Sequence, residues 1–172
     1  MTVDGTGRVE TTGGTRRLVI EREFRASPEV VLACLTESPR LGRWIGIWSG
    51  TGGPGRTVQF VMTAEGATEP QPVTIAECRA PHRLVVDFEQ DQDAWHLELD
   101  LAAVGDGGTT RLVFVQRLDF PGLESSVGPG WEYYLERLGA ALAATPEPDW
   151  PTWDDYWPHQ QAHYGGADPT GH

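Results

Sequence analysis

The sequence predicts an α+β domain in which an antiparallel β-sheet closes around one long helix near its C-terminal end. Two observations lead to this prediction. Most of segment 16–117 divides into short stretches of alternating polarity that are joined mainly by tight turns. Segment 130–144 instead carries one apolar stripe at the helical spacing i, i+4, i+7 and i+11, formed by Trp131, Leu135, Leu138 and Leu142. Such a stripe has to be buried, and the sheet is the surface that can bury it.

The first part of the chain predicts a flexible arm, one strand and two short helices. Residues 1–15 are rich in Gly and Thr, so we expect them to form the arm. Residues 17–25 alternate in polarity, and their inner face carries Leu18, Ile20, Arg22 and Phe24. Ser27 and Pro28 suit the N-cap and the first position of a helix, and segment 38–44 predicts a second short helix.

Further strands are predicted between residues 57 and 117. The alternation is clearest in segment 95–101, whose apolar residues are Trp95, Leu97, Leu99 and Leu101. Asp106-Gly107-Gly108 has the composition of a tight turn, which makes this strand and the next one a hairpin. Sequential hairpins predict an antiparallel sheet with one face exposed to solvent.

The composition excludes several classes of function. The 172 residues suit a single domain, and thirteen arginines against twenty-five acidic residues give a net charge of −12. Phosphate binding needs a basic footprint, so we expect no nucleic-acid partner and no membrane partner. The sequence has no lysine, which excludes a Schiff-base enzyme, and no asparagine, which excludes a Cys-His-Asn triad.

The remaining compositional signals predict a soluble, cytoplasmic protein. No apolar run approaches the ~18 residues of a membrane span, and residues 1–17 contain no signal-peptide core. Cys34 and Cys78 are too few for a disulfide framework. The joint absence of lysine and asparagine is typical of a GC-rich bacterial gene.

The order and spacing of these features resemble the SRPBCC, or START-like, superfamily, and within it the branch of the activator of heat-shock protein 90 ATPase. In the first half of the chain the matching residues are Arg22, Ala26, Pro28, Thr36, Pro39 and Trp44. In the second half they are Ile75, Glu77, Pro81, Arg83, Leu84, Gly108, Thr109, Gly130 and Trp131. The resemblance covers about residues 16 to 144.

The resemblance implies a helix-grip, or Bet v 1-like, fold: seven antiparallel strands wrapped around a long C-terminal helix, with two short helices closing one end. It divides the chain into the arm 1–15, a START-like domain 16–144 and an aromatic, Pro-rich extension 145–172. Relatives include chaperone activators, lipid carriers, aromatic polyketide cyclases and plant hormone receptors, so the fold alone assigns no activity. The His that members often carry near the end of the last strand is Gln116 here.

The resemblance also favours a ligand cavity between the sheet and the helix. Its apolar wall is predicted to contain Phe60, Met62, Phe88, Trp95, Phe114 and Trp131, with Trp44 and Trp48 at the mouth. Its polar groups are predicted to be Arg22, Gln116 and Tyr134. Ligand sites are mostly apolar pockets with a few aimed polar groups. The alternative is that the same side chains fill the interior as an ordinary core.

Arg22 is the most informative of these residues because an isolated buried guanidinium is very costly. One interpretation pairs it with a ligand carboxylate through two parallel hydrogen bonds. The other pairs it with a carboxylate of the protein, such as Glu77 or Glu98. The sequence leaves both interpretations open.

The titratable residues predict neither catalysis nor a metal or other cofactor. His96 falls on the outer face and His82 in a turn, so neither is placed as a base in the cavity. His159 and His163 have metal-ligand spacing, but Pro158 interrupts the helix that would align them, and we expect both to be solvated. The aromatic extension either packs on its own domain, which we prefer, or forms a homodimer contact.

The sequence therefore predicts a domain that binds a small apolar or amphipathic molecule without catalysis. One alternative is a chaperone-interacting protein, which would need an exposed binding surface instead of a pocket. Another is a polyketide cyclase or dehydratase that uses Tyr134 and Arg22 in the same cavity. The absence of an inner His counts against this last alternative.

Overall fold

This computed structural model describes residues 2–89, 94–143 and 148–164. The strands are β1 (Arg8–Thr12), β2 (Thr15–Phe24), β3 (Ile47–Ser49), β4 (Thr57–Val61), β5 (Gln71–Arg79), β6 (Arg83–Phe88), β7 (Trp95–Val104) and β8 (Thr109–Leu118). The helices are α1 (Pro28–Thr36), α2 (Ser38–Leu41), α3 (Leu123–Leu142) and α4 (Gln161–Tyr164), with 3-10 turns at Thr63–Glu65 and Trp153–Asp155. None of the helices in these ranges is long and apolar enough to cross a lipid bilayer.

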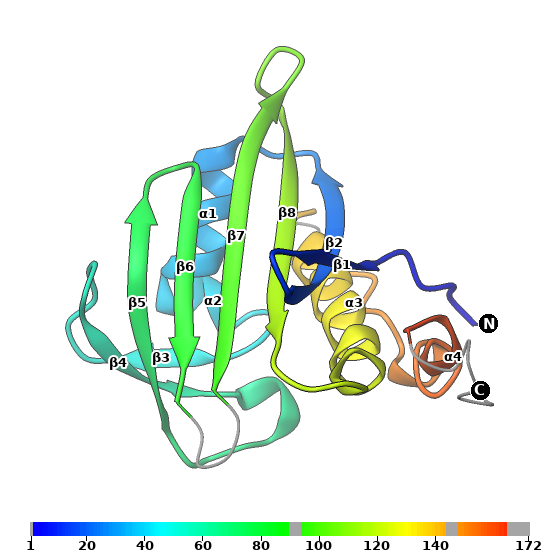
Figure 1. Cartoon of the computed structure of the whole chain (residues 1–172). Helices are drawn as coiled ribbons and strands as arrows, with labels where there is room; N and C mark the ends of the chain where they lie inside the picture. The colour runs from blue at the N-terminus through cyan, green and yellow to red at the C-terminus, as the bar shows by residue number, and fades with distance from the viewer. Residues whose placement is uncertain (1, 90–93, 144–147, 165–172) are drawn as a thin grey trace.

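The strands form one sheet in the order β1-β2-β8-β7-β6-β5-β4-β3, and every neighbouring pair is antiparallel. Figure 1 shows the sheet curving past α1 and α2, with α3 beside β2 and β8 and α4 on the outer side of α3. The prediction of an α+β helix-grip fold, with a long C-terminal helix and two short helices, is confirmed.

The sheet has one strand more than predicted. Arg8–Thr12, which fall within the expected flexible arm, pair with β2, and Arg8 lies opposite Val19. Gly13 and Gly14 close this hairpin at φ of 59° and 83°, a conformation that glycine adopts without strain. The sequence of β1 contains a single apolar residue, Val9, and all five of its residues are exposed, so no alternation of polarity marked it as a strand. The prediction of an arm is wrong for these residues.

Helix α3 begins earlier than predicted. The apolar stripe indicated a helix over residues 130–144, but the helix begins at Leu123 and contains Pro129 in its interior. Proline has no N–H to donate to the carbonyl four residues earlier, so one backbone hydrogen bond is missing there. Leu123 and Val127 are buried, and this packing offsets the missing bond.

The two short helices are held together at one end of the sheet. Ser27 caps α1, as predicted, by accepting a hydrogen bond from the N–H of Val30 at 3.4 Å. Beyond α2, the indole N–H of Trp44 donates to the carbonyl of Cys34 at 2.8 Å. These contacts fix one side of the space between the sheet and α3.

Candidate functional site

The concave side of the sheet encloses a cavity of about 430 Å³. This volume lies within the ~300–1,000 Å³ of typical small-molecule sites. The strands contribute every second side chain to its wall, namely Val58, Phe60, Val73, Ile75, Leu84, Val86, Phe88, Leu97, Leu99 and Phe114. The helices and connecting loops contribute Leu35, Thr36, Leu41, Trp44, Ile45, Gly52, Gly53, Pro54, Trp131 and Leu135, while β3 adds Trp48 and β5 adds Cys78.

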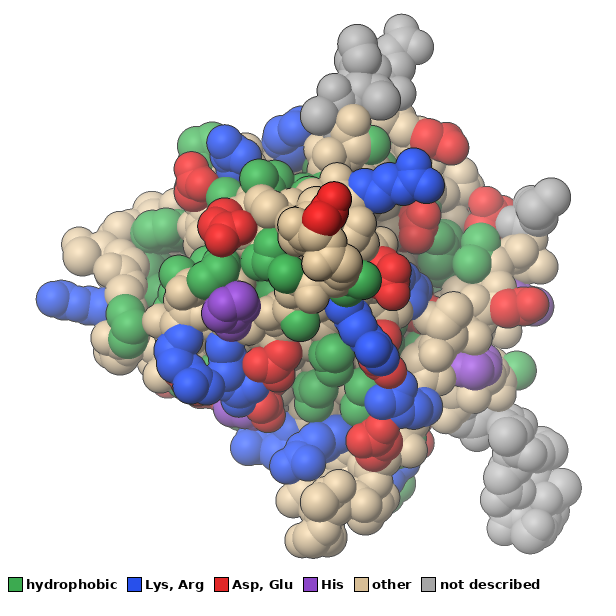
Figure 2. Space-filling model, turned by 90° about the horizontal axis from the view of Figure 1, so that it is seen from above, with side chains coloured by type: hydrophobic (Ala, Val, Ile, Leu, Met, Phe, Trp, Pro, Cys, Tyr) green, Lys and Arg blue, Asp and Glu red, His purple; other side chains and the backbone are tan. Residues whose placement is uncertain are grey.

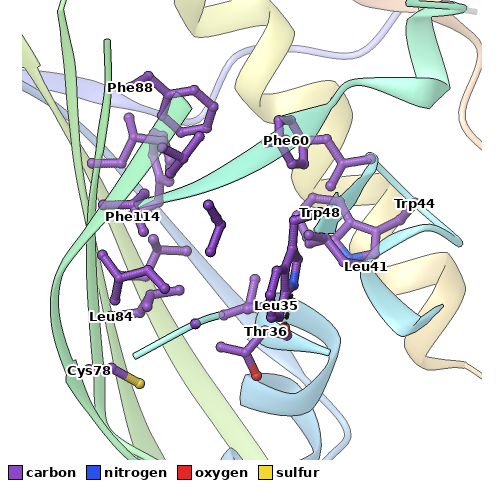
Figure 3. A pocket seen from close by; sticks show the side chains of 18 of the residues that line it. Leu35, Thr36, Leu41, Trp44, Trp48, Phe60, Cys78, Leu84, Phe88 and Phe114 are labelled. Carbon is purple, nitrogen blue, oxygen red and sulfur yellow. Dashed lines mark hydrogen bonds between the residues drawn. The ribbon is translucent and has the colours of Figure 1, made fainter. Parts of the chain in front are cut away.

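The cavity has an aromatic end and a more polar end. Figure 3 shows Phe60 and Phe88 at one end, and Thr36 and Cys78 at the other. The rings of Phe60 and Phe88 meet edge to face at 5.8 Å between centroids. Phe114 and Trp131 pack at 4.7 Å between centroids. None of the described residues in the wall carries a charge.

The indole N–H groups in the wall already have partners within the protein. Trp44 donates to the carbonyl of Cys34, and Trp48 donates to the carbonyl of Thr36 at 2.7 Å. Trp131 donates to Oε1 of Gln116 at 2.6 Å. These rings therefore present their carbon atoms to the cavity and offer no free donor.

The structure brings together the apolar residues predicted for the wall and the mouth, with two exceptions. Trp44, Trp48, Phe60, Phe88, Phe114 and Trp131 all line the cavity. Trp95 lies behind the wall, where its ring packs on Phe88 at 6.3 Å and on Trp131 at 6.2 Å. Met62 lies outside the wall as well, because β4 ends at Val61 and the alternation of the strand ends with it.

Arg22 lies outside the cavity and is paired within the protein. Its Nη2 contacts Oε1 of Glu132 on α3 at 3.0 Å, and its Nη1 donates to Oγ1 of Thr6 at 2.6 Å. A salt bridge to the protein was one of the two interpretations, but its predicted partners are wrong. Glu77 and Glu98 instead contact Arg83 on the outer face of the sheet, at 3.0 and 2.6 Å.

Gln116 and Tyr134 do not line the cavity either. Gln116 is fully buried behind Trp131, whose N–H it accepts. Tyr134 donates its hydroxyl to Oε1 of Glu65 at 2.9 Å. Burial and this hydrogen bond raise the pKa of Tyr134 above its ordinary value, so the phenol keeps its proton to a higher pH than an exposed tyrosine does.

Sequence reasoning missed Thr36, Cys78 and the loop residues Gly52 and Gly53. Cys78 was missed because the register of β5 shifts by one residue between Ile75 and Glu77. Such a bulge exchanges the two faces of a strand, so Cys78 points inward where alternation alone would have placed Glu77. Thr36 matched the family motif but carried no sign of a cavity position. A break in the alternation after Ile75 is the one signal that the sequence offered.

A second region, which we call the terminal cluster, lies on the other side of α3. It consists of Thr6, Arg22, Glu132 and Tyr164, and it joins both ends of the described chain to the helix. The fully buried carboxylate of Glu132 accepts from the backbone N–H of Thr6 at 2.8 Å and from the hydroxyl of Tyr164. Burial, and then this hydrogen bond, raise the pKa of Tyr164.

The C-terminal extension, where it is described, packs on its own domain. Tyr156 and Tyr164 are buried, and Gln160 donates to the carbonyl of Val3 at 2.9 Å. His159 contacts Asp4, and His163 contacts the carbonyl of Gly7. Within the described ranges no three His, Cys, Asp or Glu side chains are placed to hold a metal ion. A homodimer contact through this extension stays a prediction.

The remaining surface carries mixed charges. Figure 2 shows basic and acidic side chains interleaved with hydrophobic ones on the face seen from above. On the outer face of the sheet, His96 contacts Asp87 at 2.7 Å, which places this imidazole away from the cavity, as predicted. The described wall therefore contains neither a carboxylate nor an imidazole, and its one titratable group is the thiol of Cys78.

Comparisons with known proteins agree with this architecture. The family model described as "Activator of Hsp90 ATPase homolog 1-like protein" matches residues 25–143. No curated protein sequence matches the chain.

Several solved structures share the fold at low sequence identity. CalU16 from Micromonospora echinospora is 21% identical with a TM-score of 0.72, over 93% of this chain and 94% of that one. DynU16, described as a protein in the dynemicin biosynthetic locus, is 18% identical with a TM-score of 0.63, over 78% of this chain and 51% of that one. PFC0360w, described as an HSP90 activator from Plasmodium falciparum, is 16% identical with a TM-score of 0.59, over 74% and 96%.

Proposed function

The chain belongs to the family of Activator of Hsp90 ATPase homolog 1-like proteins, and we propose that it binds a small apolar or amphipathic molecule in the cavity between the sheet and α3. The observation that carries this proposal is an apolar space of about 430 Å³ between the sheet and α3. The inward-facing side chains of the strands could have filled this space as an ordinary core, but they leave it open. An empty cavity lowers stability in proportion to its volume. A ligand that fills the space would recover the contacts that the wall lacks.

The same geometry argues against a catalytic role for the cavity. A general acid or base must lie within hydrogen-bond reach of the reacting group. Arg22 and Tyr134, the residues that a cyclase or dehydratase mechanism would use, both lie outside the wall and are paired with Glu132 and Glu65. We therefore propose binding and release of the ligand without covalent change.

Uptake of N-phenyl-1-naphthylamine tests this proposal, because this neutral probe fluoresces strongly only in apolar surroundings. We expect saturable binding of one probe per chain. Val86→Phe should weaken it strongly, since Val86 lines the cavity. Val30→Phe makes the same chemical change at a residue that is 42% exposed on α1 and should leave uptake unchanged. Absence of saturable uptake, or equal loss in both variants, would contradict the proposal.

A second candidate function is an interaction with Hsp90. The observation that favours it is the family model, which is described by that activity and matches residues 25–143. Such a role would use an exposed surface and would not depend on the cavity. Stimulation of the ATPase of purified Hsp90 by the protein, unchanged in the Val86→Phe variant, would support it.

A further inference from the structure

Gln116 is a fully buried polar residue that lies behind Trp131 of the cavity wall. It belongs to β8, and its register partners are Leu18 on β2 and Leu97 on β7, which are both buried and apolar. Oε1 of Gln116 accepts the indole N–H of Trp131 at 2.6 Å. Because Trp131 lines the cavity and Gln116 does not, this N–H points away from the cavity.

The amide of Gln116 has one polar group left over. An indole N–H can only donate, so the amide oxygen has to face it and the NH₂ group is turned elsewhere. Among the described residues, Nε2 of Gln116 finds no hydrogen-bond partner. A buried donor without a partner is costly, and two apolar residues at these positions would avoid that cost. The contact that explains the amide is therefore the one that its oxygen makes with Trp131.

Aromatic packing and the hydrogen bond hold Trp131 in different ways. Its ring packs on Phe114, Trp95 and Tyr134 at 4.7, 6.2 and 6.4 Å between centroids, contacts that depend on the faces and edges of the rings. The N–H group instead requires an acceptor, since burying it unpaired is costly. Without the oxygen of Gln116, the open space that Trp131 borders is the cavity, where water or a ligand could supply an acceptor.

We propose that Gln116 is a positioning residue that sets the specificity of the cavity through Trp131. It holds the indole with its N–H turned out of the cavity, so a ligand meets carbon atoms at this part of the wall. A ligand with hydrocarbon or aromatic surface there is preferred over one that places a carbonyl oxygen there. This inference rests on the proposed function, because it concerns the specificity of the same cavity.

Two uncharged ligands of similar shape test the inference. 2-Acetylnaphthalene carries a carbonyl oxygen where 2-isopropylnaphthalene carries a methyl group. Their affinities are measured by displacement of N-phenyl-1-naphthylamine from the wild-type protein and from Gln116→Met, which keeps the length of the side chain and removes the amide. The quantity compared is the ratio of the two affinities, because the difference in hydrophobicity between the ligands cancels between proteins.

We expect the ratio, in favour of 2-acetylnaphthalene, to rise about three- to tenfold in Gln116→Met, as one new hydrogen bond from the released indole would give. Gln116→Leu also lacks the acceptor and should give the same rise. Gln116→Glu keeps an acceptor oxygen in either protonation state and should keep the wild-type ratio. Leu112→Met changes a fully buried residue of β8 outside the wall and should not alter the ratio.

A double-mutant cycle shows whether Gln116 acts through Trp131. Trp131→Phe removes the indole N–H, so adding Gln116→Met to this variant should leave the ratio unchanged. An altered interior that does not involve the indole would change the ratio to the same extent with and without Trp131. Thermal unfolding shows that each variant in the cycle is folded.

The indole N–H signal of Trp131 gives a direct readout. Each of the seven tryptophans contributes one such signal to a ¹⁵N–¹H correlation spectrum, and the signal missing from Trp131→Phe identifies that of Trp131. Short hydrogen bonds move these signals to low field, so we expect an upfield shift in Gln116→Met. Addition of 2-acetylnaphthalene should move the signal back toward low field in this variant, and Gln116→Glu should keep the wild-type position.

The outcomes separate this inference from the proposed function. If both naphthalenes displace the probe but the ratio is the same in the wild type, Gln116→Met and Gln116→Leu, the cavity binds ligands and Gln116 does not select them. If Gln116→Met changes the ratio equally in the Trp131→Phe background, the action through the indole is wrong. If the wild-type protein does not take up the probe at all, the proposed function fails and this inference with it.

Discussion

Trp131 and Glu132 are neighbours in the sequence, yet they belong to opposite kinds of interior. Trp131 faces the cavity, where the wall is apolar and a space of about 430 Å³ is left open. Glu132 faces the terminal cluster, where its fully buried carboxylate meets Thr6, Arg22 and Tyr164. Successive residues on a helix point about 100° apart, so α3 separates the two environments.

The difference shows which interior is structural and which is suited to a ligand. A buried charge is tolerated only when its hydrogen-bonding capacity is met, so the terminal cluster has to be filled and specific. An apolar wall has no such requirement and can remain open, at a cost in packing. Substitutions should therefore lower the free energy of unfolding strongly in the terminal cluster and only slightly in the cavity wall.

The largest effect is expected for Glu132→Ala. It leaves the guanidinium of Arg22 without its carboxylate and the hydroxyl of Tyr164 without its acceptor, and breaking a buried ion pair costs about 3–5 kcal/mol. Glu136→Ala, one turn further along α3 at an exposed position, should change the free energy of unfolding by less than about 0.5 kcal/mol. Chemical denaturation measures both, and equal effects would mean that the cluster is not structural.

Enlarging a side chain should distinguish the open interior from the filled one. Leu112→Phe adds volume at a fully buried position outside the cavity and should destabilise by about 1–3 kcal/mol. Val86→Phe adds its volume to the cavity and should cost less than about 1 kcal/mol, since no well-packed neighbours have to move. Urea denaturation compares the two variants, and a cost for Val86→Phe as high as that for Leu112→Phe would contradict an open cavity.

A pair of glycines on α3 tests the fit of Tyr164 in the terminal cluster. A Cβ at Gly128 would lie 2.5 Å from Cδ2 of Tyr164, whereas a Cβ at Gly130 meets nothing within 4 Å. Gly130→Ala should stabilise the protein by about 0.5–1 kcal/mol, because alanine favours a helix. Gly128→Ala should destabilise it, by about 0.5–2 kcal/mol after that gain is subtracted from the overpacking cost. Thermal unfolding measures both variants. If both are stabilised, Tyr164 does not pack against Gly128.

The smallest effect is expected from pH. Burial and the hydrogen bond to Glu132 raise the pKa of Tyr164 above its ordinary value of 10, and burial raises the pKa of Tyr156 to about 12. Above pH 10 the unfolded chain therefore loses phenolic protons that the folded chain keeps, and stability falls as the pH rises. Tyr164→Phe should reduce this slope. Unfolding free energies measured from pH 8 to pH 11 check it, and an unchanged slope would contradict the assignment to Tyr164.

Local patterns in the sequence were sufficient for the fold and for the aromatic part of the cavity. Alternation places Phe60, Phe88 and Phe114 on the inner face because side chains of a strand point alternately to its two faces. Helical spacing places Trp131 and Leu135 on one stripe for a similar reason. These rules depend only on near neighbours in the chain, and a single sequence contains them.

The tertiary structure decided the polar partners in the terminal cluster. Thr6, Arg22, Glu132 and Tyr164 are separated by up to 158 positions in the sequence, and no local spacing records that their elements cross at one point. Cys78 entered the cavity because a single-residue register shift exchanged the faces of β5. Burial periodicity is a property of one element, whereas a hydrogen-bond partner is a property of two elements and of the angle at which they meet.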